Sequence, residues 1–405
     1  MRLTMKERKI VTKALCEQYR KAAKKDKGRL LNEVVEATGY NRGYARWLLR
    51  QHGRRVSVGP GVAVEGDVRT RSRRERPRTY GPEVLAPLKK MWILLDHLAS
   101  KRLVAALPEV VAHLVALKEL RVTKAVQRKL VSISAATVDR LLNPERLKYT
   151  LKGHSHTKPG TLLKHQIPVR TFADWDDARP GFFEMDLVGH DGGKASGDYC
   201  FTLDLTDVST GWTELYAIQN KAEKWVFEAL VAVRARLPFA MLGLDSDNGS
   251  EFINAHLLAY CRQEEITFTR SRPYRKNDTC YVEQKNWSIV RRYVGYARFD
   301  TPEALTLFNE LYVLVRDFTN FFLPSMKLKE KVRTGAHVLR RYDKARTPYQ
   351  RLLDSPQLGQ ADKKRLKAHY KTLNLAELSR RILKLQGALA RLGTRTSQAD
   401  EEKKK

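Results

Sequence analysis

The sequence predicts a multidomain protein with N-terminal all-α helix-turn-helix units, a central α/β core and a helical C-terminal region. Apolar residues recur at helical spacing before residue 147, alternate as in strands from residue 182, and return to helical spacing after residue 326. The charge follows the same division. Residues 1–160 hold 36 Lys and Arg against 14 Asp and Glu, residues 161–330 hold 20 against 24, and residues 331–405 hold 20 against 7. Two basic arms around a mildly acidic globule favour a nucleic-acid partner over a polybasic membrane-surface protein.

Composition argues against several other classes of protein. No apolar run approaches the ~20 residues of a membrane-spanning helix, and the charged N-terminal segment has no signal-peptide pattern. The four cysteines are far apart in sequence, which argues against a zinc site or a disulfide framework. We therefore expect a cytoplasmic protein with no membrane partner.

Residues 1–53 are expected to form a helix-turn-helix DNA-binding domain. Gly39 can end one helix and Asn41 can cap the next, a basic one. Three arginines of that second helix are spaced by four residues, so they share one face. The alternative is an ordinary helical hairpin with a solvated basic face. The DNA contacts expected here are Arg42, Arg46 and Arg50.

A second helical domain is expected between two basic linkers, one before it and one after it. Residues 54–81 are an Arg-rich linker that could follow a phosphate backbone or serve only as a solvated tether. Its expected DNA contacts are Arg71, Arg73, Arg74 and Arg76. Residues 82–146 repeat the helix-turn-helix pattern, with Ser134 as an N-cap, but are less basic, so a packing scaffold is the alternative to a DNA reader. Residues 147–176 form the second linker.

Residues 177–325 are expected to form the catalytic core. The predicted strands cover 182–188, 199–205, 213–218, 240–245 and 267–270, with a hairpin turn at 191–197. The predicted helices cover 221–237, 251–264 and 279–297. Three strands, helix, strand, helix, strand, helix is the order of a ribonuclease-H-like fold, with a mixed five-stranded sheet and flanking helices.

Three acids fall at informative places in this core. Asp186 lies within the first strand, where an isolated charge is costly unless it is paired or metal-bound. Asp247 follows a buried strand at its carboxyl end, and Asn248-Gly249 makes the turn that aims it. Glu283 lies in the first turns of a long helix. Carboxylates suit two Mg²⁺ ions, for which Mn²⁺ can substitute, and water or a DNA 3′-hydroxyl would be the nucleophile.

Other residues of the core have open assignments. Asp245 is the alternative to Asp247, and Glu184 is a candidate supporting group. Asp204 and Asp207 are expected to cap a hairpin strand. The auxiliary candidates are His190, which could instead make a structural hydrogen bond, and Asn248.

The segment before Glu283 is basic and contains a proline, which suits a loop that grips DNA beside the active site. Its expected DNA contacts, with those of the following helix, are Arg272, Arg275, Lys276, Asn277, Lys285 and Asn286. A solvated basic face is the alternative for the helix.

Residues 326–395 are expected to be a basic helical region, followed by a disordered tail at 396–405. Leucine and isoleucine recur there with spacings of three and four residues, at Leu375, Leu378, Ile382, Leu385, Leu389 and Leu392. This pattern fits either a helix packed on the core or a self-association helix.

The motifs around the three acids resemble those of the retroviral-integrase superfamily of DDE transposases, specifically the bacterial insertion-sequence transposases with an integrase core. The resemblance covers about 170–330, and its main motifs are Ser246-Asp247-Asn248-Gly249, Glu251-Phe252, Arg272-Pro273-Tyr274 and Lys285-Asn286 after Glu283. By position, the family's three acids fall on Asp186, Asp247 and Glu283. The zinc module of retroviral integrases is missing.

This resemblance implies metal-dependent cleavage at the ends of a mobile element and joining of the 3′-hydroxyl to target DNA. It implies double-stranded DNA as partner, a homo-oligomer on DNA and a bacterial, nucleoid-associated location, and it leaves open whether a helper ATPase takes part. The alternative functions are a metal-dependent nuclease of the same fold and a non-enzymatic DNA-binding regulator.

Overall fold

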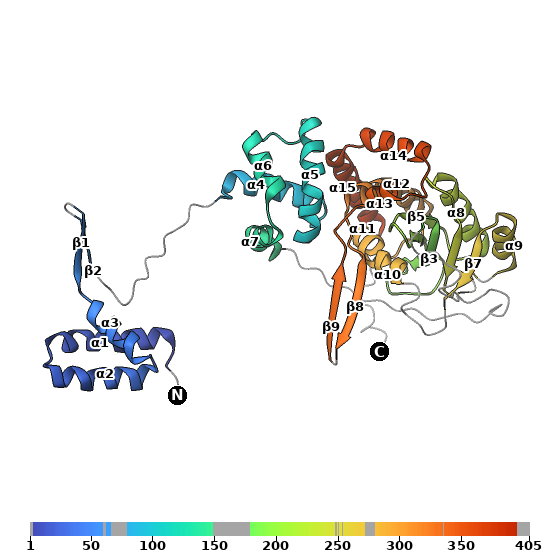
Figure 1. The fold of residues 1–405 in the computed structure, drawn as a ribbon. Helices are drawn as coiled ribbons and strands as arrows, with labels where there is room; N and C mark the ends of the chain where they lie inside the picture. Colours follow the sequence, from blue (N-terminus) through green and yellow to red (C-terminus); the bar gives the residue numbers. More distant parts are fainter. Residues whose placement is uncertain are drawn as a thin grey trace. The chain divides into compact units, whose positions relative to one another are not determined.

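The computed structural model describes residues 3–59, 62–65, 79–148, 179–247, 249, 251–252, 254–271, 280–334 and 336–394. They belong to two compact units, residues 1–79 and 80–405, which are considered separately (Figure 1). Some predictions lie outside the described residues: those for the 396–405 tail and most of the 147–176 linker, and those for Asn248, Arg71, Arg73, Arg74, Arg76, Arg272, Arg275, Lys276 and Asn277.

The first unit is three helices around a small apolar core, followed by a hairpin. The helices are α1 (Met5–Lys21), α2 (Lys24–Thr38) and α3 (Arg42–Gln51). Gly39, at a φ of 66° that favours glycine, ends α2, and the Asn41 side chain caps α3 by accepting a hydrogen bond from the Gly43 N–H. Strands β1 (Arg55–Gly59) and β2 (Val62–Glu65) pair where the sequence predicts a linker.

The second unit begins with four helices: α4 (Pro82–Leu94), α5 (Ser100–Ala116), α6 (Lys124–Ser132) and α7 (Ala135–Arg146). Ser134 caps α7 by accepting a hydrogen bond from the Thr137 N–H. The apolar residues of these helices belong to the same buried cluster as those of helices far along the chain. The four helices are therefore packed on the rest of this unit through a shared core.

A five-stranded mixed sheet forms the centre of the second unit, in the order β5-β4-β3-β6-β7. Its strands are β3 (Phe182–Gly189), β4 (Phe201–Asp207), β5 (Thr213–Ile218), β6 (Gly243–Ser246) and β7 (Thr267–Arg270). The first three strands are antiparallel neighbours, and β6 and β7 run parallel to β3. This arrangement confirms the predicted α/β core.

The two faces of the sheet differ in polarity. One face buries apolar residues such as Phe183, Met185 and Leu203 against α8 (Glu223–Arg236) and α9 (Ala255–Gln263). The alternate residues of the same strands, among them Glu184, face α10 (Cys280–Lys285), η1 (Asn286–Arg291), α11 (Arg292–Val294) and α12 (Pro302–Phe322). Helix α9 begins later than predicted because Asn254 caps it.

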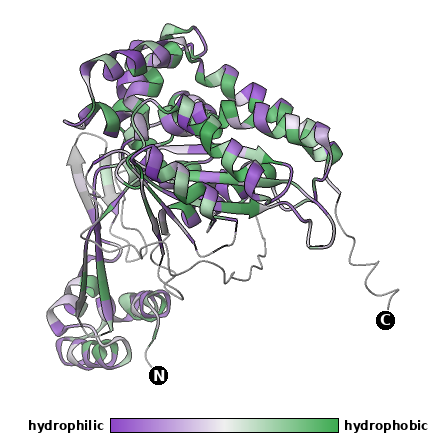
Figure 2. Cartoon of the chain, turned by 90° about the vertical axis from the view of Figure 1, so that its right-hand side faces the viewer, coloured by the Kyte–Doolittle hydropathy of each residue, from purple (hydrophilic) through white to green (hydrophobic). Residues whose placement is uncertain are grey.

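The C-terminal region contains a hairpin that the sequence did not predict, formed by β8 (Leu328–Thr334) and β9 (His337–Tyr342). Helices α13 (Pro348–Asp354), α14 (Gln360–Thr372) and α15 (Leu375–Leu392) follow. The apolar seam of α15 packs on α12 and joins the main buried cluster, as the packing alternative expects. Figure 2 accordingly shows helices of this unit that carry both hydrophobic and hydrophilic residues. Among the described helices, none combines the length and apolarity needed to cross a membrane.

Candidate active site

Asp186 and Asp247 occupy matching positions on neighbouring parallel strands. The register pairs Phe182 with Gly243 and continues to Met185 with Ser246. One residue further along each chain are Asp186 and Asp247. Adjacent strands lie about 4.8 Å apart, so the register places the two residues next to each other just past the end of β6. Both residues are partly exposed, so solvent and ions can reach them.

Glu184 fixes the helix that carries the third acid. Its Oε2 atom accepts hydrogen bonds from the backbone N–H groups of Tyr281 and Val282, at 2.8 and 3.0 Å. Glu184 is fully buried and lies on the same side of β3 as Asp186. Helix α10 therefore starts directly over the sheet, and Glu283 follows in its first turn with an exposed side chain.

The surroundings of Asp186 combine two hydrogen-bond donors with the negative charges of the other two acids. Its Oδ1 accepts a hydrogen bond from the Leu187 N–H at 2.8 Å, and its Oδ2 accepts one from the Asn286 amide at 2.6 Å. Burial, and then the negative charge of Asp247, raises the pKa of Asp186 to about 7, and Glu283 acts in the same direction. Burial also raises the pKa of Asp247. The site therefore concentrates negative charge that a cation would stabilise.

The donor chemistry of these acids fits a hard divalent cation, because all of the candidate ligand atoms are carboxylate oxygens. In the part of the chain that the structure describes, no three His, Cys, Asp or Glu side chains converge closely enough to hold a metal ion. The backbone thus places the three acids as neighbours without closing them into a metal cage. Glu283 is exposed, so turning its side chain toward Asp186 would cost little buried surface.

A second set of acids lies behind the first. Asp204 stands opposite Asp186 in the β3–β4 ladder, and Asp245 stands opposite Glu184 in the β3–β6 ladder. Of these four acids, Glu184, Asp204 and Asp245 are fully buried, and Asp186 is partly exposed. The sequence-based expectation for Asp204 was wrong, because it lies inside β4 and not at the end of that strand. Burial raises its pKa well above the usual range, and the nearby Lys285 ammonium opposes this effect.

Asp207 does hold a turn, as expected. Its carboxylate accepts hydrogen bonds from the N–H groups of Gly181 and Thr210, at 2.8 and 2.7 Å, and from the Thr210 hydroxyl. This fixes the β4–β5 turn and the residues that lead into β3.

Comparison with known proteins identifies the domain that carries Asp186 and Asp247. Residues 176–276 match the model of the integrase core domain. The chain is also 39% identical, over 343 residues, to the uncharacterized protein y4rM of Sinorhizobium fredii. The aligned region spans 84% of this chain and 93% of y4rM. The chain belongs to the y4rM family and carries an integrase core domain. Asp186 and Asp247 lie within the matched core, whereas Glu283 lies beyond it.

Two solved structures resemble parts of this integrase-core protein. The catalytic core domain of BIV integrase is 18% identical, with 42% of this chain and 91% of that chain covered and a TM-score of 0.27. The HTLV-2 integrase catalytic core domain, in complex with magnesium in a dimeric form, is 14% identical, with 37% and 93% covered and a TM-score of 0.28.

Two residues of the integrase core that were predicted to contact DNA face the sheet instead. Asn286, the first residue of η1, donates its amide to Asp186, and a π-helical turn at this point is typical of functional sites. Lys285 donates to the Gly211 carbonyl at 3.2 Å, and burial lowers its pKa to about 8 while Asp204 acts in the opposite direction. This side of the helix packs on the acids of β3 and β4, and the DNA contacts of Lys285 and Asn286 stay predictions.

His190 is packed in the core of the protein and makes a hydrogen bond there, as its structural alternative expects. It is fully buried, its Nε2 lies 2.7 Å from the Thr202 hydroxyl, and its ring contacts Phe299 and Phe308. Burial lowers its pKa to about 3, so it is neutral at physiological pH. His190 directly follows the last residue of β3, four positions after Asp186.

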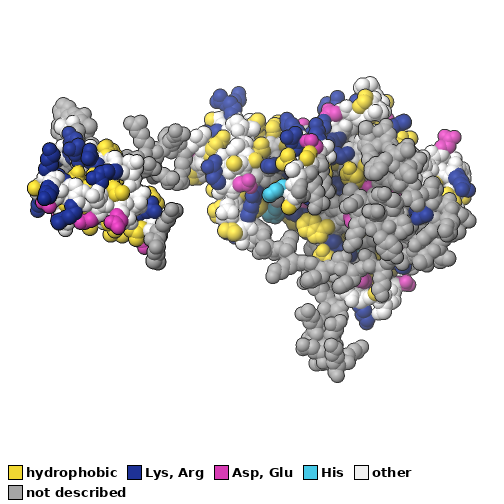
Figure 3. Space-filling model, turned by 60° about the horizontal axis from the view of Figure 1, so that its bottom comes forward, with side chains coloured by type: hydrophobic (Ala, Val, Ile, Leu, Met, Phe, Trp, Pro, Cys, Tyr) yellow, Lys and Arg dark blue, Asp and Glu magenta, His cyan; other side chains and the backbone are white. Residues whose placement is uncertain are grey.

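The basic face of α3 is exposed. Arg42, Arg46 and Arg50 point to solvent, and Figure 3 shows Lys and Arg side chains gathered on one face of this unit. The same helix exposes the stacked rings of Tyr44 and Trp47, 48% and 56% accessible. Exposed aromatic rings beside arginines are common in nucleic-acid interfaces. No role for these two rings was predicted from the sequence, although both lie in the predicted basic helix.

Proposed function

We propose that this chain is a DNA transposase or integrase that cleaves phosphodiester bonds at the ends of a mobile element and joins the 3′-hydroxyl to target DNA. The observation that carries the proposal is the register of Asp186 beside Asp247, with the Glu283 helix capped by Glu184 above them. Three elements of an integrase core thus deliver one acid each to one end of the sheet.

Each residue of the site has a separate task in this proposal. Asp186, Asp247 and Glu283 would hold two Mg²⁺ ions, for which Mn²⁺ can substitute. Such ions activate the attacking oxygen and stabilise the leaving oxygen of the phosphodiester. Asn286 keeps the Asp186 carboxylate oriented, and Glu184 keeps α10 over the sheet.

The basic regions would supply the DNA contacts. Residues 1–53 would bind the element ends through Arg42, Arg46 and Arg50, with 82–146 as a second helical domain and 177–325 as the catalytic domain. The net charge of +31 supports a polyanionic partner. Joining two ends to one target calls for a homo-oligomer assembled on DNA. We place this activity in the bacterial cytoplasm, at the nucleoid.

The test is a joining assay with DNA from the borders of the gene, supplied uncut and already cut to a 3′-hydroxyl, in Mg²⁺. Wild-type protein should cleave the first substrate and join the second to a plasmid. Asp247→Asn and Glu283→Gln should do neither, yet bind the ends with unchanged affinity. Joining at the normal rate by Glu283→Gln would contradict the assignment.

The same assay separates the alternative functions. A plain nuclease would cut DNA but never join the pre-cut ends. A DNA-binding regulator would bind without any metal-dependent nicking.

A further inference from the structure

The β8–β9 hairpin extends away from the sheet and helices of its unit, as Figure 1 shows. Its two strands make their main contacts with each other. Among the side chains that the structure describes, nearly all are exposed, including apolar ones: Leu328, Val332, Leu339 and Tyr342 are 49%, 42%, 55% and 51% accessible. A lone two-stranded hairpin is only marginally stable in water, so this one is suited to a partner that covers it.

The charges of the hairpin favour a polyanion as that partner. Residues 328–342 contain five Lys and Arg but one acid, Glu330, which is paired with Arg341 at 3.1 Å. Lys329 and Arg340 of this hairpin are exposed. A phosphate backbone alongside would neutralise such charges, whereas a second copy of the same basic hairpin would bring like charges together.

The shape of the hairpin also fits duplex DNA. A two-stranded β-ribbon can enter the major groove, and apolar side chains on it can contact thymine methyl groups. The exposed apolar residues are thus compatible with DNA as the partner, and the basic excess favours a polyanion over an uncharged apolar surface.

The base of the hairpin is anchored next to the acids. Lys327 donates to the carbonyls of Val208 and Ser209, both at 2.7 Å, and its ammonium lies 5.6 Å from the centre of the Tyr281 ring. Tyr281 is one of the two residues capped by Glu184, two positions before Glu283. DNA held along this hairpin would therefore run close to the helix that carries the third acid.

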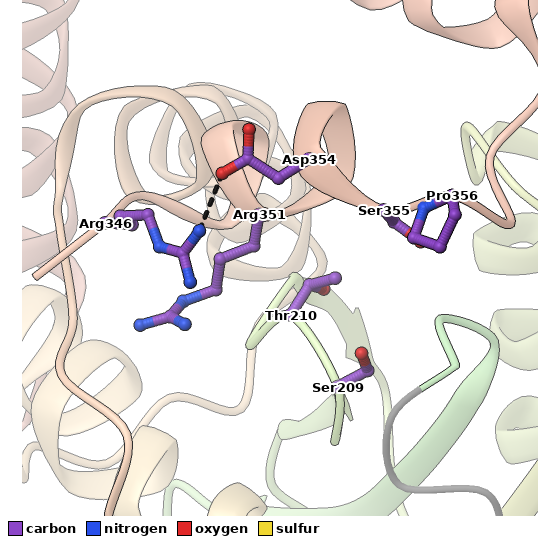
Figure 4. A pocket seen from close by; sticks show the side chains of 7 residues that line it. All are labelled: Ser209, Thr210, Arg346, Arg351, Asp354, Ser355 and Pro356. Carbon is purple, nitrogen blue, oxygen red and sulfur yellow. Dashed lines mark hydrogen bonds and ion pairs between the residues drawn. The ribbon is translucent and has the colours of Figure 1, made fainter. Parts of the chain in front are cut away.

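Ion pairs stiffen this base further. Asp343 accepts hydrogen bonds from the Lys327 N–H and from the Arg351 guanidinium, both at 2.6 Å. Figure 4 shows the adjoining cavity of about 230 Å³, where Arg346 is paired with Asp354 at 2.7 Å. Arg346 and Arg351 of this cavity each have a carboxylate partner, which helps to hold the base of the hairpin in place.

We propose that the β8–β9 hairpin is a DNA-binding arm, which holds duplex DNA beside the acidic site through its basic residues. The proposal extends the proposed function, since it names a DNA contact of the same enzyme, but binding can be measured without the reaction.

The experiment compares two triple variants of the full-length protein that lose the same charge. Lys329→Gln, Arg340→Gln and Lys344→Gln remove exposed charge from the hairpin and its base. Lys364→Gln, Lys367→Gln and Lys371→Gln remove it from exposed positions on α14. Binding of a random-sequence labelled duplex is measured by fluorescence anisotropy without divalent metal, over a range of salt concentrations.

We expect the hairpin variant to bind about tenfold or more weakly, with the slope of log K against log salt reduced by about 2, because each lost phosphate contact removes about 0.9. The α14 variant should stay within about twofold of the wild type. Equal effects of the two variants, or none from the hairpin variant, would overturn the proposal. The proposal would also be overturned if the hairpin variant no longer formed a dimer in sedimentation but kept its DNA affinity. The partner of the hairpin would then be a second copy of the chain.

A second measurement does not depend on removing any charge. A photo-crosslinking amino acid at Thr334, near the hairpin tip, should attach to the duplex, whereas one at the exposed Leu383 of α15 should not. No crosslink at position 334 in protein that binds the duplex would refute the arm. Failure of the proposed chemistry would appear separately, as tight binding and crosslinking without joining of pre-cut ends.

Discussion

Most charged residues of the central sheet are buried, whereas the described charged residues of α3 and the β8–β9 hairpin are exposed. Glu184, Asp204 and Asp245 are fully buried, and each has a hydrogen-bond donor from a neighbouring group. Arg46 and Arg340 are exposed. Burying a carboxylate costs several kcal/mol unless it is compensated, whereas an exposed charge costs little. The buried carboxylates are therefore held in place by their hydrogen bonds, whereas the exposed arginines are free to meet a polyanion.

The largest expected effect comes from the charge of Asp186. Asp186→Asn keeps the shape of the side chain but should reduce cleavage of end-containing DNA by about a thousandfold or more, because a metal-binding charge at the reacting phosphate is lost. The affinity for DNA should stay within about twofold. Cleavage rate and equilibrium DNA binding are measured on the same preparation. Weakened binding with a normal cleavage rate would mean that Asp186 contributes to DNA binding and not to the reaction.

A smaller loss is expected at Glu184. Outer-shell partners of metal ligands typically affect metal affinity or activity by about 10- to 100-fold, and Glu184→Ala should lower the rate by such a factor while raising the Mg²⁺ concentration needed for half-maximal activity. Glu184→Gln, which keeps an acceptor oxygen for the Tyr281 and Val282 N–H groups, should recover part of the activity. A lower melting temperature with an unchanged Mg²⁺ requirement would mean that Glu184 only stabilises the fold.

The arginines of α3 test the exposed side of the comparison. Changing Arg42, Arg46 and Arg50 to Gln should weaken binding to element ends about tenfold and reduce the salt dependence by about 2, with the rate on saturating DNA unchanged. A matched control removes the exposed Lys21, Lys24 and Lys25 at the junction of α1 and α2. If both triples weaken binding equally, α3 has no special role.

The smallest effect concerns stability and pH. The pKa of His190 is about 3 in the folded protein, below its unfolded value of about 6.5. Its contribution to stability is therefore complete above pH 6.5 and declines, by about 1.4 kcal/mol per pH unit, as the pH falls toward 3. In urea denaturation, His190→Gln should lose less stability between pH 7 and pH 5 than the wild type does. An identical loss in the two proteins would place the acid sensitivity elsewhere.

Sequence reasoning anticipated the features that depend on local rules. The cap at Asn41, the left-handed Gly39, the cap at Ser134 and the order of strands and helices follow from residue type and periodicity over a few positions. The proposed acids also stand out locally, because a charged residue within an apolar strand and an Asn-Gly turn after another strand are visible without a fold.

Local sequence rules therefore account for the helices before residue 147, for the strands of the central sheet and for the residues that could carry the chemistry, but not for the β1–β2 and β8–β9 hairpins. Packing between elements decided what several of these side chains face. Lys285 and Asn286 face the sheet, His190 lies in the core, and the apolar seam of α15 packs on α12. Each of these depends on a partner that is distant along the chain, including His190, whose ring contacts Phe299 and Phe308 as well as the nearer Thr202. The physical reason is that periodicity fixes which residues share a face of an element, but only packing between distant elements fixes what that face meets.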